Sequence, residues 1–243
     1  DALLWDCGSL MRTDVGSRTL VRGARALGVT RIPVAVLTHP NLDHYNGLVD
    51  AARTMGLRTL LVGDATLDHV ASSRDTGLGL ALLELERRGV EIRRVGAGDV
   101  VGFGELEIRF LWPPEGYLSG AANERSLVAA FVARGAGLEA AAIVLTGDIQ
   151  AEAIGGVMEM YPELRAGVLE MPHHGSAIRA AVDLLYHTEA RSVHQSTGER
   201  RAMDPRMGVW REAHGESGGV WRITARDGWI WSEALRGGAV RSG

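Results

Sequence analysis

The chain has 243 residues, of which 46% are hydrophobic and 23% are charged, an ordinary balance for a soluble α/β protein. Its net charge is −4 and it contains no lysine, so it lacks the global basic surface of a tight nucleic-acid binder. If the protein binds a polyanion, the contacts must therefore come from local arginines or from a bound metal. The single cysteine, Cys7, excludes an internal disulfide and is expected in the core.

The sequence begins inside a strand-like segment, so we expect an excised piece of a longer protein. No apolar run approaches the roughly 18 to 20 residues that span a bilayer, and no signal peptide is visible. This piece by itself is therefore expected to be soluble.

In the first third of the chain, short apolar runs alternate with amphipathic stretches. The strands predicted here are 3–8, 32–39 and 57–63. The helices are 17–28, which stops at Gly28, then 46–56, and 76–89, the longest, which is closed by Gly89.

A strand-rich section follows, with predicted strands at 91–95, 104–114, 126–135 and 140–148. Helices are then expected at 149–161 and 177–188, and strands at 166–174 and 190–197. The segment 218–235 is predicted to be a hairpin that turns at Arg226-Asp227-Gly228. This order favours mixed sheets with helices on their outer faces, in one domain over residues 1–243.

Candidate metal ligands follow three of the predicted strands. They are His39, Asn41, Asp43 and His44 after the apolar run at 32–37, Asp148 after 140–147, and His173 and His174 after 166–172. Loops at one edge of a sheet can bring such residues together. Imidazole and carboxylate are ligands of Zn²⁺, Mn²⁺ and Fe, and two metals sharing a carboxylate can lower the pKa of a bound water and clamp a phosphoryl group.

Each of these motifs taken singly also has an ordinary structural interpretation. A Gly-Asp after a strand is usually a turn, and a His-His pair is more often surface or core polar structure. The three motifs in this order, each behind an apolar strand, are a specific signal.

The ordered motifs resemble the metallo-β-lactamase superfamily. They are Asp6-Cys7-Gly8, His39-x-x-x-Asp43-His44, Thr146-Gly147-Asp148 and Pro172-His173-His174-Gly175-Ser176. The last two are similar to the extracytoplasmic hydrolase domain of ComEC-type DNA-internalisation competence proteins. The resemblance covers nearly the whole chain. It implies a four-layer αβ/βα sandwich with metals at the sheet edge, and a first hairpin upstream of Asp1.

The resemblance also implies one or two divalent metals, Mn²⁺ or Zn²⁺. The first site would use His39, Asn41 and a bridging Asp148. The second would use Asp43, His44, Asp148 and one of His173 and His174, with His174 preferred. Superfamily members usually carry His or Asp at the position of Asn41, and Asn123 stands where a third ligand of the first site is expected. The first site is therefore predicted to be weak.

Substrate contacts are expected from Ser176 and from the loop Ser196–Pro205. Arg200 and Arg201 could bind phosphate there, although a solvated pair is an equal alternative. Asp204 stands where competence-type members have a histidine. It could act as a general acid, but at an ordinary pKa it is ionised at neutral pH and would repel phosphate.

The leading hypothesis is a metal-dependent phosphodiester hydrolase, a nuclease that acts on DNA during competence-type uptake. Asp148 and Asp43 would hold the metals. By resemblance the domain would be extracytoplasmic, membrane-associated and tethered to a membrane channel. Asn41 and Asp204 also motivate a second hypothesis, a degenerate scaffold domain of that channel. A third is a hydrolase of another substrate, such as a lactone or a phosphocholine ester.

Overall fold

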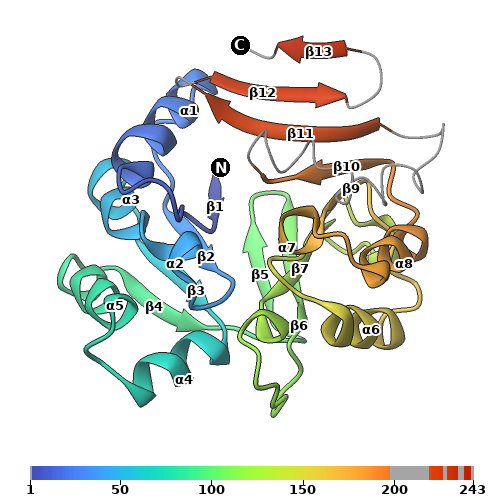
Figure 1. The fold of residues 1–243 in the computed structure, drawn as a ribbon, viewed down its shortest axis with the longest axis horizontal. Coiled ribbons are helices and arrows are strands. Elements are labelled where there is room, and N and C mark those ends of the chain that lie inside the picture. Colours follow the sequence, from blue (N-terminus) through green and yellow to red (C-terminus); the bar gives the residue numbers. More distant parts are fainter. Residues whose placement is uncertain (1, 198–218, 227–228, 235–237, 242–243) are drawn as a thin grey trace. The chain divides into compact units, whose positions relative to one another are not determined.

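The computed structural model describes residues 2–197, 219–226, 229–234 and 238–241 (Figure 1). The chain divides into two compact units. The first comprises Asp1–Val95 with Ala225–Ile230 and Gly243, and the second comprises Gly96–Thr224 with Trp231–Ser242.

The first unit is built on a parallel four-stranded sheet in the order β1-β2-β3-β4. Its strands are β1 (Leu3–Trp5), β2 (Val34–Leu37), β3 (Thr59–Val62) and β4 (Glu91–Arg94). The helical segments between them are η1 (Val15–Thr19), α1 (Leu20–Ala26), α2 (Leu42–Tyr45), α3 (Leu48–Met55), α4 (Asp64–Ser72) and α5 (Gly77–Arg87). Parallel strands need such crossover connections. As a result, the carboxyl ends of all four strands lie at the same edge of the sheet.

The core of the first unit lies between the sheet and helices α3 and α5. Leu37 and Leu60 of the sheet share a buried cluster with Leu48 of α3 and with Leu82 and Leu85 of α5. The spacing of the leucines on α5 places them on one face of that helix. The helix begins at an N-cap, where the Thr76 hydroxyl accepts a hydrogen bond from the Gly79 amide.

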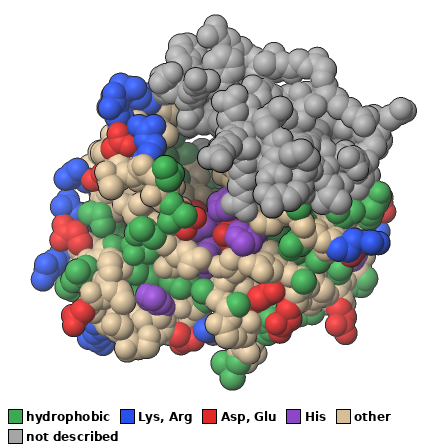
Figure 2. Space-filling model, viewed as in Figure 1, with side chains coloured by type: hydrophobic (Ala, Val, Ile, Leu, Met, Phe, Trp, Pro, Cys, Tyr) green, Lys and Arg blue, Asp and Glu red, His purple; other side chains and the backbone are tan. Residues whose placement is uncertain are grey.

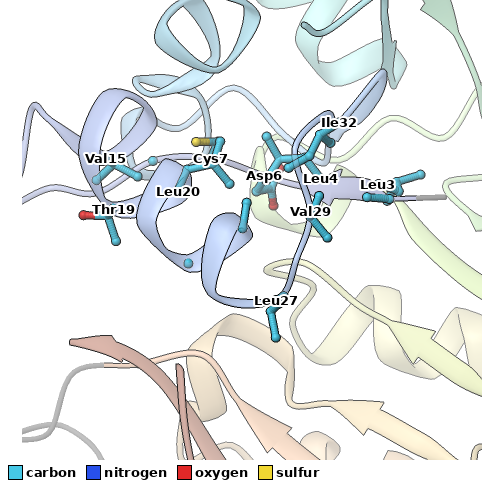
Figure 3. A pocket seen from close by; sticks show the side chains of 14 residues that line it. Leu3, Leu4, Asp6, Cys7, Val15, Thr19, Leu20, Leu27, Val29 and Ile32 are labelled. Atoms are coloured by element: carbon cyan, nitrogen blue, oxygen red, sulfur yellow. The ribbon is translucent and has the colours of Figure 1, made fainter. Parts of the chain in front are cut away.

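A cavity of about 420 Å³ lies beside β1 in the first unit (Figure 3). Leu3 and Leu4 of β1 line it together with Leu20 and Leu27 from the α1 region. Its walls are largely apolar, with Asp6 at one place. A largely apolar lining offers few hydrogen-bonding partners to a polar ligand.

The second sheet has nine strands among the described residues, in the order β13-β12-β11-β10-β9-β8-β7-β6-β5. They are β5 (Val100–Phe103), β6 (Leu106–Trp112), β7 (Val128–Ala133), β8 (Ile143–Leu145), β9 (Val168–Glu170), β10 (Ser192–Gln195), β11 (Gly219–Arg226), β12 (Trp229–Ala234) and β13 (Gly238–Arg241). β5 to β8 pair antiparallel, whereas β8 to β11 pair parallel. The predicted mixed sheet is confirmed.

Helices α6 (Ala151–Met160) and α8 (Arg179–Thr188) cover this sheet and share one buried cluster with it. Ile154 of α6 and Leu185 of α8 pack with Leu169 of β9 and Val193 of β10. The short segments η2 (Asn123–Arg125), η3 (Leu138–Ala140) and α7 (Pro172–Gly175) lie in the connections. Among the described residues, no helix is long and apolar enough to cross a membrane.

The predicted strands and helices all occur, with shorter bounds except at the start of 17–28, where η1 already begins at Val15. β11 and β12 are neighbours, as the hairpin requires. The turn residues Asp227 and Gly228 lie outside the described residues. The elements α2, α4, β5 and β13 and the short segments η2 and η3 were not predicted from the sequence. The two histidines of 166–174 were also predicted to lie in a strand, whereas β9 ends at Glu170. The prediction of one domain over 1–243 stays a prediction.

Candidate functional site

In the first unit, the candidate ligands lie where β1 and β2 end. These strands are parallel neighbours, with Trp5 opposite Val36. Asp6 therefore leaves β1 at the same edge at which Thr38 and His39 leave β2. The pairing of two parallel strands thus brings residues more than 30 positions apart in the sequence into contact.

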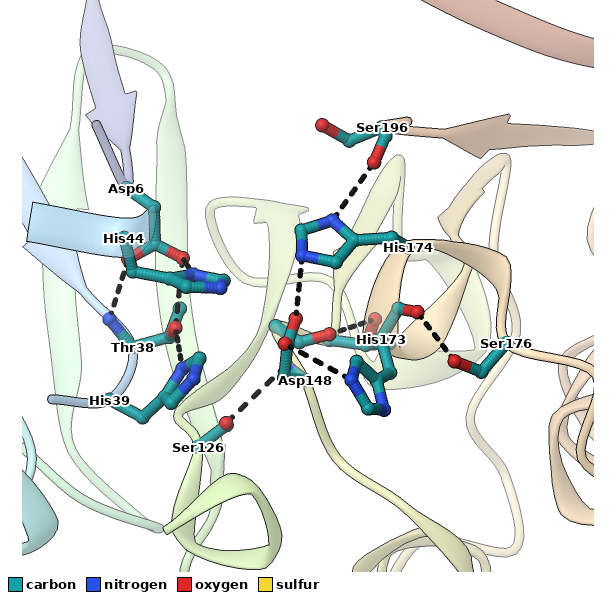
Figure 4. Close-up of polar contacts among 12 residues, drawn as sticks. Asp6, Thr38, His39, His44, Ser126, Asp148, His173, His174, Ser176 and Ser196 are labelled. Carbon is teal, nitrogen blue, oxygen red and sulfur yellow. Dashed lines mark hydrogen bonds and ion pairs between the residues drawn. The ribbon is translucent and has the colours of Figure 1, made fainter. Parts of the chain in front are cut away.

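Asp6 is the centre of a hydrogen-bond network at this edge (Figure 4). Its Oδ1 accepts from the Thr38 amide at 2.8 Å, and its Oδ2 accepts from the Thr38 hydroxyl at 2.8 Å. Oδ2 also lies 2.8 Å from His44 Nδ1. Asp6 has φ +57°, a left-handed conformation that aspartate tolerates better than most residues. This conformation holds the carboxylate over the end of β2.

The two imidazoles of this edge lie close together and are buried. His39 Nδ1 is 3.0 Å from the Thr38 hydroxyl oxygen, and the ring centroids of His39 and His44 are 4.0 Å apart. One ring nitrogen of His39 lies within 4.8 Å of one of His44, and a carboxylate oxygen of Asp43 lies within the same distance of His44. In the first unit, His44 therefore lies within ligand-sharing distance of both His39 and Asp43.

Backbone contacts fix the segment that carries Asp43 and His44. The Cys7 amide donates to the His44 carbonyl at 2.8 Å, and the Gly47 amide donates to the Cys7 carbonyl at 2.8 Å. A Cβ on Gly8 would lie 2.5 Å from the Asp43 carbonyl oxygen and 2.7 Å from the His44 amide. Glycine at position 8 thus allows α2 to pack directly on the strand-end loop.

Cys7 is a core residue, as the sequence predicted. It is buried, and desolvation, with the nearby Asp6 and Asp50 carboxylates adding to it, raises the pKa of its thiol to about 12. The thiol therefore stays protonated at neutral pH, which makes it a poor nucleophile and a poor metal ligand.

In the second unit, Asp148 follows β8 and is held by contacts to the backbone around it. Its own amide donates to the Ser126 hydroxyl at 3.3 Å. The Glu170 carboxylate accepts from the amides of Thr146 at 3.0 Å and Gly147 at 3.3 Å. The residues on the N-terminal side of Asp148 are thus fixed by a carboxylate from the neighbouring strand β9.

The residues after Asp148 are held by a second carboxylate, that of Glu124. It is 9% exposed and accepts from the amides of Gln150, Glu152 and Ala153 at 2.9 to 3.3 Å. These amides belong to the N-terminal turn of α6. The first N–H groups of a helix have no carbonyl acceptor within the helix, so the carboxylate supplies one. A negative charge there also complements the helix dipole.

His173 and His174 lie in a turn after β9, with φ +51° and +59°, followed by Gly175 at +77°. Their Nε2 atoms lie 3.7 and 3.6 Å from the Asp148 carboxylate (Figure 4). Because β8 and β9 are parallel neighbours, Asp148 and this turn leave the sheet at one edge. Because three successive residues have a left-handed backbone conformation, both imidazole rings point toward the same carboxylate.

The hydrogen bonds of the two rings give them different proton positions. His174 Nδ1 lies 2.9 Å from the Ser196 carbonyl, which can only accept, so Nδ1 carries a hydrogen, and in the neutral ring the lone pair is on Nε2. His173 Nδ1 lies 3.3 Å from Gln150 Nε2, which can only donate, so His173 carries its hydrogen on Nε2. When both rings are neutral, His174 thus presents an acceptor and His173 a donor toward the Asp148 carboxylate.

The remaining predicted site residues fall into two groups. Asn41 is exposed at the N-cap of α2, Asn123 begins η2, and the Ser176 hydroxyl donates to the His173 carbonyl at 2.9 Å. Arg200, Arg201 and Asp204 lie outside the described residues. Four residues that support the site were not predicted, because nothing in the sequence distinguishes them from ordinary polar residues: Thr38, Ser126, Glu124 and Glu170.

The chain is similar to ComE operon protein 3 of Bacillus subtilis (strain 168), with 25% identity over 185 residues. The matched segment is 76% of this chain and 22% of that protein, so the chain spans about a fifth of the relative's length. No protein-family model matches the chain.

Two solved structures show a similar fold. One is the metallo-β-lactamase fold protein YhfI from Bacillus subtilis, with a TM-score of 0.50 and 14% identity, covering 95% of this chain and 86% of that one. The other is CmlA, a diiron β-hydroxylase from Streptomyces venezuelae, with a TM-score of 0.50 and 15% identity, covering 85% of this chain and 45% of that one. At these identities the likeness concerns the fold, and it confirms the predicted fold class.

Proposed function

We propose that this chain, which has the metallo-β-lactamase fold and resembles ComEC-type competence proteins, is a metal-dependent phosphodiester hydrolase. The observation that carries the proposal is the Asp6 network. It holds two buried imidazoles by their Nδ1 atoms at the end of β2, beside the Asp43 carboxylate. In metal sites, ligating histidines almost always bond through their second ring nitrogen to such partners.

The donor set of each unit fits a divalent cation. The first unit offers imidazole nitrogens and a carboxylate, and the second offers Asp148 with His173 and His174, which is the ligand chemistry of Zn²⁺, Mn²⁺ and Fe. A bound metal would polarise the phosphoryl group and lower the pKa of water. We assign a divalent metal to each ligand set, held by His39, Asp43 and His44 in the first unit and by Asp148 with one of the two histidines after β9 in the second.

Of the two histidines after β9, we assign His174 to the metal. In the neutral ring its Nε2 carries the lone pair, because Nδ1 donates to the Ser196 carbonyl. His173 carries its hydrogen on Nε2, so we assign it a hydrogen bond to the substrate or to Asp148. We further propose that Ser176, Arg200 and Arg201 contact the substrate and that Asp204 serves as a general acid.

The first metal site should be the weaker one. Asn41 offers a neutral oxygen in place of the His or Asp of the superfamily, and Asn123 does not supply a third imidazole. Neutral oxygen ligands suit harder cations better than zinc. We therefore expect hydrolysis to depend on Mn²⁺ in the millimolar range rather than to saturate with stoichiometric zinc.

DNA is the substrate that the ComEC-type resemblance supports best. On the face shown in Figure 2, the described Arg and Asp/Glu side chains are interspersed and form no broad basic patch. With a net charge of −4, contact with DNA would be local and would rely on the metals and a few arginines. We propose that one strand is degraded during uptake, by a single domain that is extracytoplasmic and tethered to a membrane channel.

The test is a hydrolysis assay on protein stripped of metal with a chelator. Single- and double-stranded DNA with labelled 5′ ends are incubated with Mn²⁺, Mg²⁺ or Zn²⁺, and native mass spectrometry counts the bound metals. We expect cleavage with Mn²⁺ and its loss in His39→Ala. Bound metal without cleavage of either DNA, but with cleavage of a lactone or phosphocholine ester, would replace the nuclease proposal. A metal count of zero would support the scaffold hypothesis.

A substitution at Asn41 tests the assignment of the first site. Asn41→Asp restores a negative oxygen and should tighten metal binding by about ten- to a hundredfold, with a gain in turnover. Calorimetric titration with Mn²⁺ and the DNA assay measure the two effects on the same protein. If neither quantity changes, Asn41 does not bind metal and the assignment is wrong.

A further inference from the structure

We infer that Asp6 is a positioning residue that sets the proton positions of both His39 and His44, and that it acts on His39 through the Thr38 hydroxyl. The inference rests on the proposed function in one respect, since it concerns rings that we assign to a metal. Its evidence lies entirely within the first unit, in four hydrogen bonds of 2.8 to 3.0 Å.

The relay to His39 follows from the hydrogen inventory of threonine. The Thr38 hydroxyl has one hydrogen, and that hydrogen is donated to Asp6 Oδ2. Towards His39 the same oxygen can then only accept, so His39 Nδ1 must carry a hydrogen. The lone pair of the His39 ring is therefore on Nε2, the nitrogen that a metal would bind.

His44 is set directly by the same carboxylate oxygen. Asp6 Oδ2 has no hydrogen to donate when it is ionised, so His44 Nδ1 must be the donor across the 2.8 Å contact. The lone pair of this ring is again on Nε2. One carboxylate thus sets both rings in the same tautomer, and the His39 and Thr38 side chains are fully buried.

Asparagine at position 6 should reverse both tautomers. The Thr38 amide hydrogen must still face an oxygen, so the side-chain amide nitrogen takes the place of Oδ2. Its two hydrogens then point to the Thr38 hydroxyl and to His44 Nδ1. His44 Nδ1 becomes an acceptor, and the Thr38 hydroxyl turns its hydrogen to His39 Nδ1. Both rings must then carry their hydrogen on Nε2, which blocks the atom that would bind metal.

The backbone should tolerate this substitution. Asparagine adopts the left-handed conformation of Asp6 as readily as aspartate does, and the two side chains have the same shape. A change in the rings is therefore separable from loss of the fold, which circular dichroism and the unfolding midpoint monitor.

The experiment is a two-bond ¹H–¹⁵N correlation spectrum of the imidazoles in metal-free protein, at a pH where both rings are neutral. His39→Gln and His44→Gln assign the signals. We expect Nδ1–H for both rings in the wild type and Nε2–H for both in Asp6→Asn. Calorimetry with Mn²⁺ should show affinity weaker by about ten- to a hundredfold in Asp6→Asn.

Variants at Thr38 separate the two branches of the network. Thr38→Val removes the hydroxyl relay, so the His39 ring should no longer favour the Nδ1–H tautomer, whereas His44 should keep it. Thr38→Ser retains a hydroxyl and should restore the wild-type spectrum. Unchanged tautomers in Asp6→Asn, or a change at His44 in Thr38→Val, would overturn the inference. The spectra need neither metal nor substrate, so tautomers that behave as expected in a protein without hydrolysis would count against the proposed function alone.

Discussion

The two edges that carry the candidate ligands are organised by opposite means. In the first unit, a carboxylate bonds to side chains, because Asp6 holds the His44 ring directly and the His39 ring through the Thr38 hydroxyl. In the second unit, Glu170 and Glu124 bond almost only to backbone amides, before and after Asp148. One edge fixes proton positions, and the other fixes the path of the chain.

This difference has an energetic consequence. Asp6→Asn leaves a hydrogen-bonding side chain of the same shape in place, so its main effect should be on ligand chemistry. Loss of Glu124 would instead leave buried amides at the start of α6 without their acceptor, at a cost of about 1–3 kcal/mol for a buried unsatisfied group. Variants of the two edges should therefore separate function from stability.

The largest expected effect is on hydrolysis, at the residue that the second edge positions. Asp148→Asn removes the charge of the proposed metal ligand and should lower the rate by more than about a hundredfold, since even outer-shell partners account for ten- to a hundredfold. The fold should survive, because the bond between the residue's amide and Ser126 does not involve the carboxylate. The assay is DNA cleavage with Mn²⁺.

Asp183→Asn is the matched control, because Asp183 lies on α8 and forms an exposed pair with Arg179. It should retain wild-type activity. Equal activity of the Asp148 and Asp183 variants, with normal metal content, would show that Asp148 is only a turn residue.

The second prediction concerns the stability of the Asp148 loop. Glu124→Ala should lower the free energy of unfolding by about 2–3 kcal/mol, because a buried charged acceptor of three amides is lost. Glu124→Gln keeps one oxygen and should cost less. Urea unfolding measures both, with the exposed Glu159→Ala at the end of α6 as the control. A cost no greater than that of Glu159→Ala would refute the role given to Glu124.

A smaller loss is expected at Gly175, which ends the left-handed turn of the second edge. Gly175→Ala should cost about 1–2 kcal/mol, because its φ of +77° is strained for alanine and the new Cβ would lie 2.6–2.8 Å from the Gln195 side chain. A double-mutant cycle with Gln195→Ala separates these causes. If the coupling between the two substitutions is zero, the clash contributes nothing.

The smallest expected effect is the pH dependence contributed by His194 on β10. Burial lowers the pKa of this ring from its ordinary value of 6.5. The unfolded chain therefore binds the proton more readily, so the stability from this group is fully present above pH 6.5 and is lost as the pH falls through the lowered pKa. His194→Gln should flatten the fall of the melting temperature between about pH 8 and about pH 5, whereas the exposed His69→Gln should not.

The sequence predicted the elements with strong apolar patterns and the ligand motifs at their ends. It missed α4, whose segment Asp64–Ser72 mixes polar and apolar residues without a clear apolar face, and β5, which has only four residues, one of them Gly102. It also extended the strand through His173 and His174, because an apolar run followed by Pro172 does not reveal a left-handed turn.

The supporting residues could not be predicted for a different reason. Asp6 belongs to a recognisable motif, but its contact with Thr38 exists only because β1 and β2 are neighbours. Glu124 and Glu170 look like ordinary surface carboxylates in the sequence. Their partners are amides, which every residue has and no motif records. Local patterns therefore revealed the ligands, whereas the groups that hold them depend on strand pairing.

The buried thiol of Cys7 has a practical consequence for spectroscopy. A pKa raised to about 12 keeps this thiol protonated at neutral pH, and the side chain is 5% exposed. Maleimides and nitroxide reagents should therefore leave it unmodified. Since the sequence has no other cysteine, a cysteine introduced at the exposed Leu80 or Leu118 would be labelled selectively in an otherwise native chain. A doubly labelled protein would allow the distance between the two units to be measured in solution, with and without Mn²⁺.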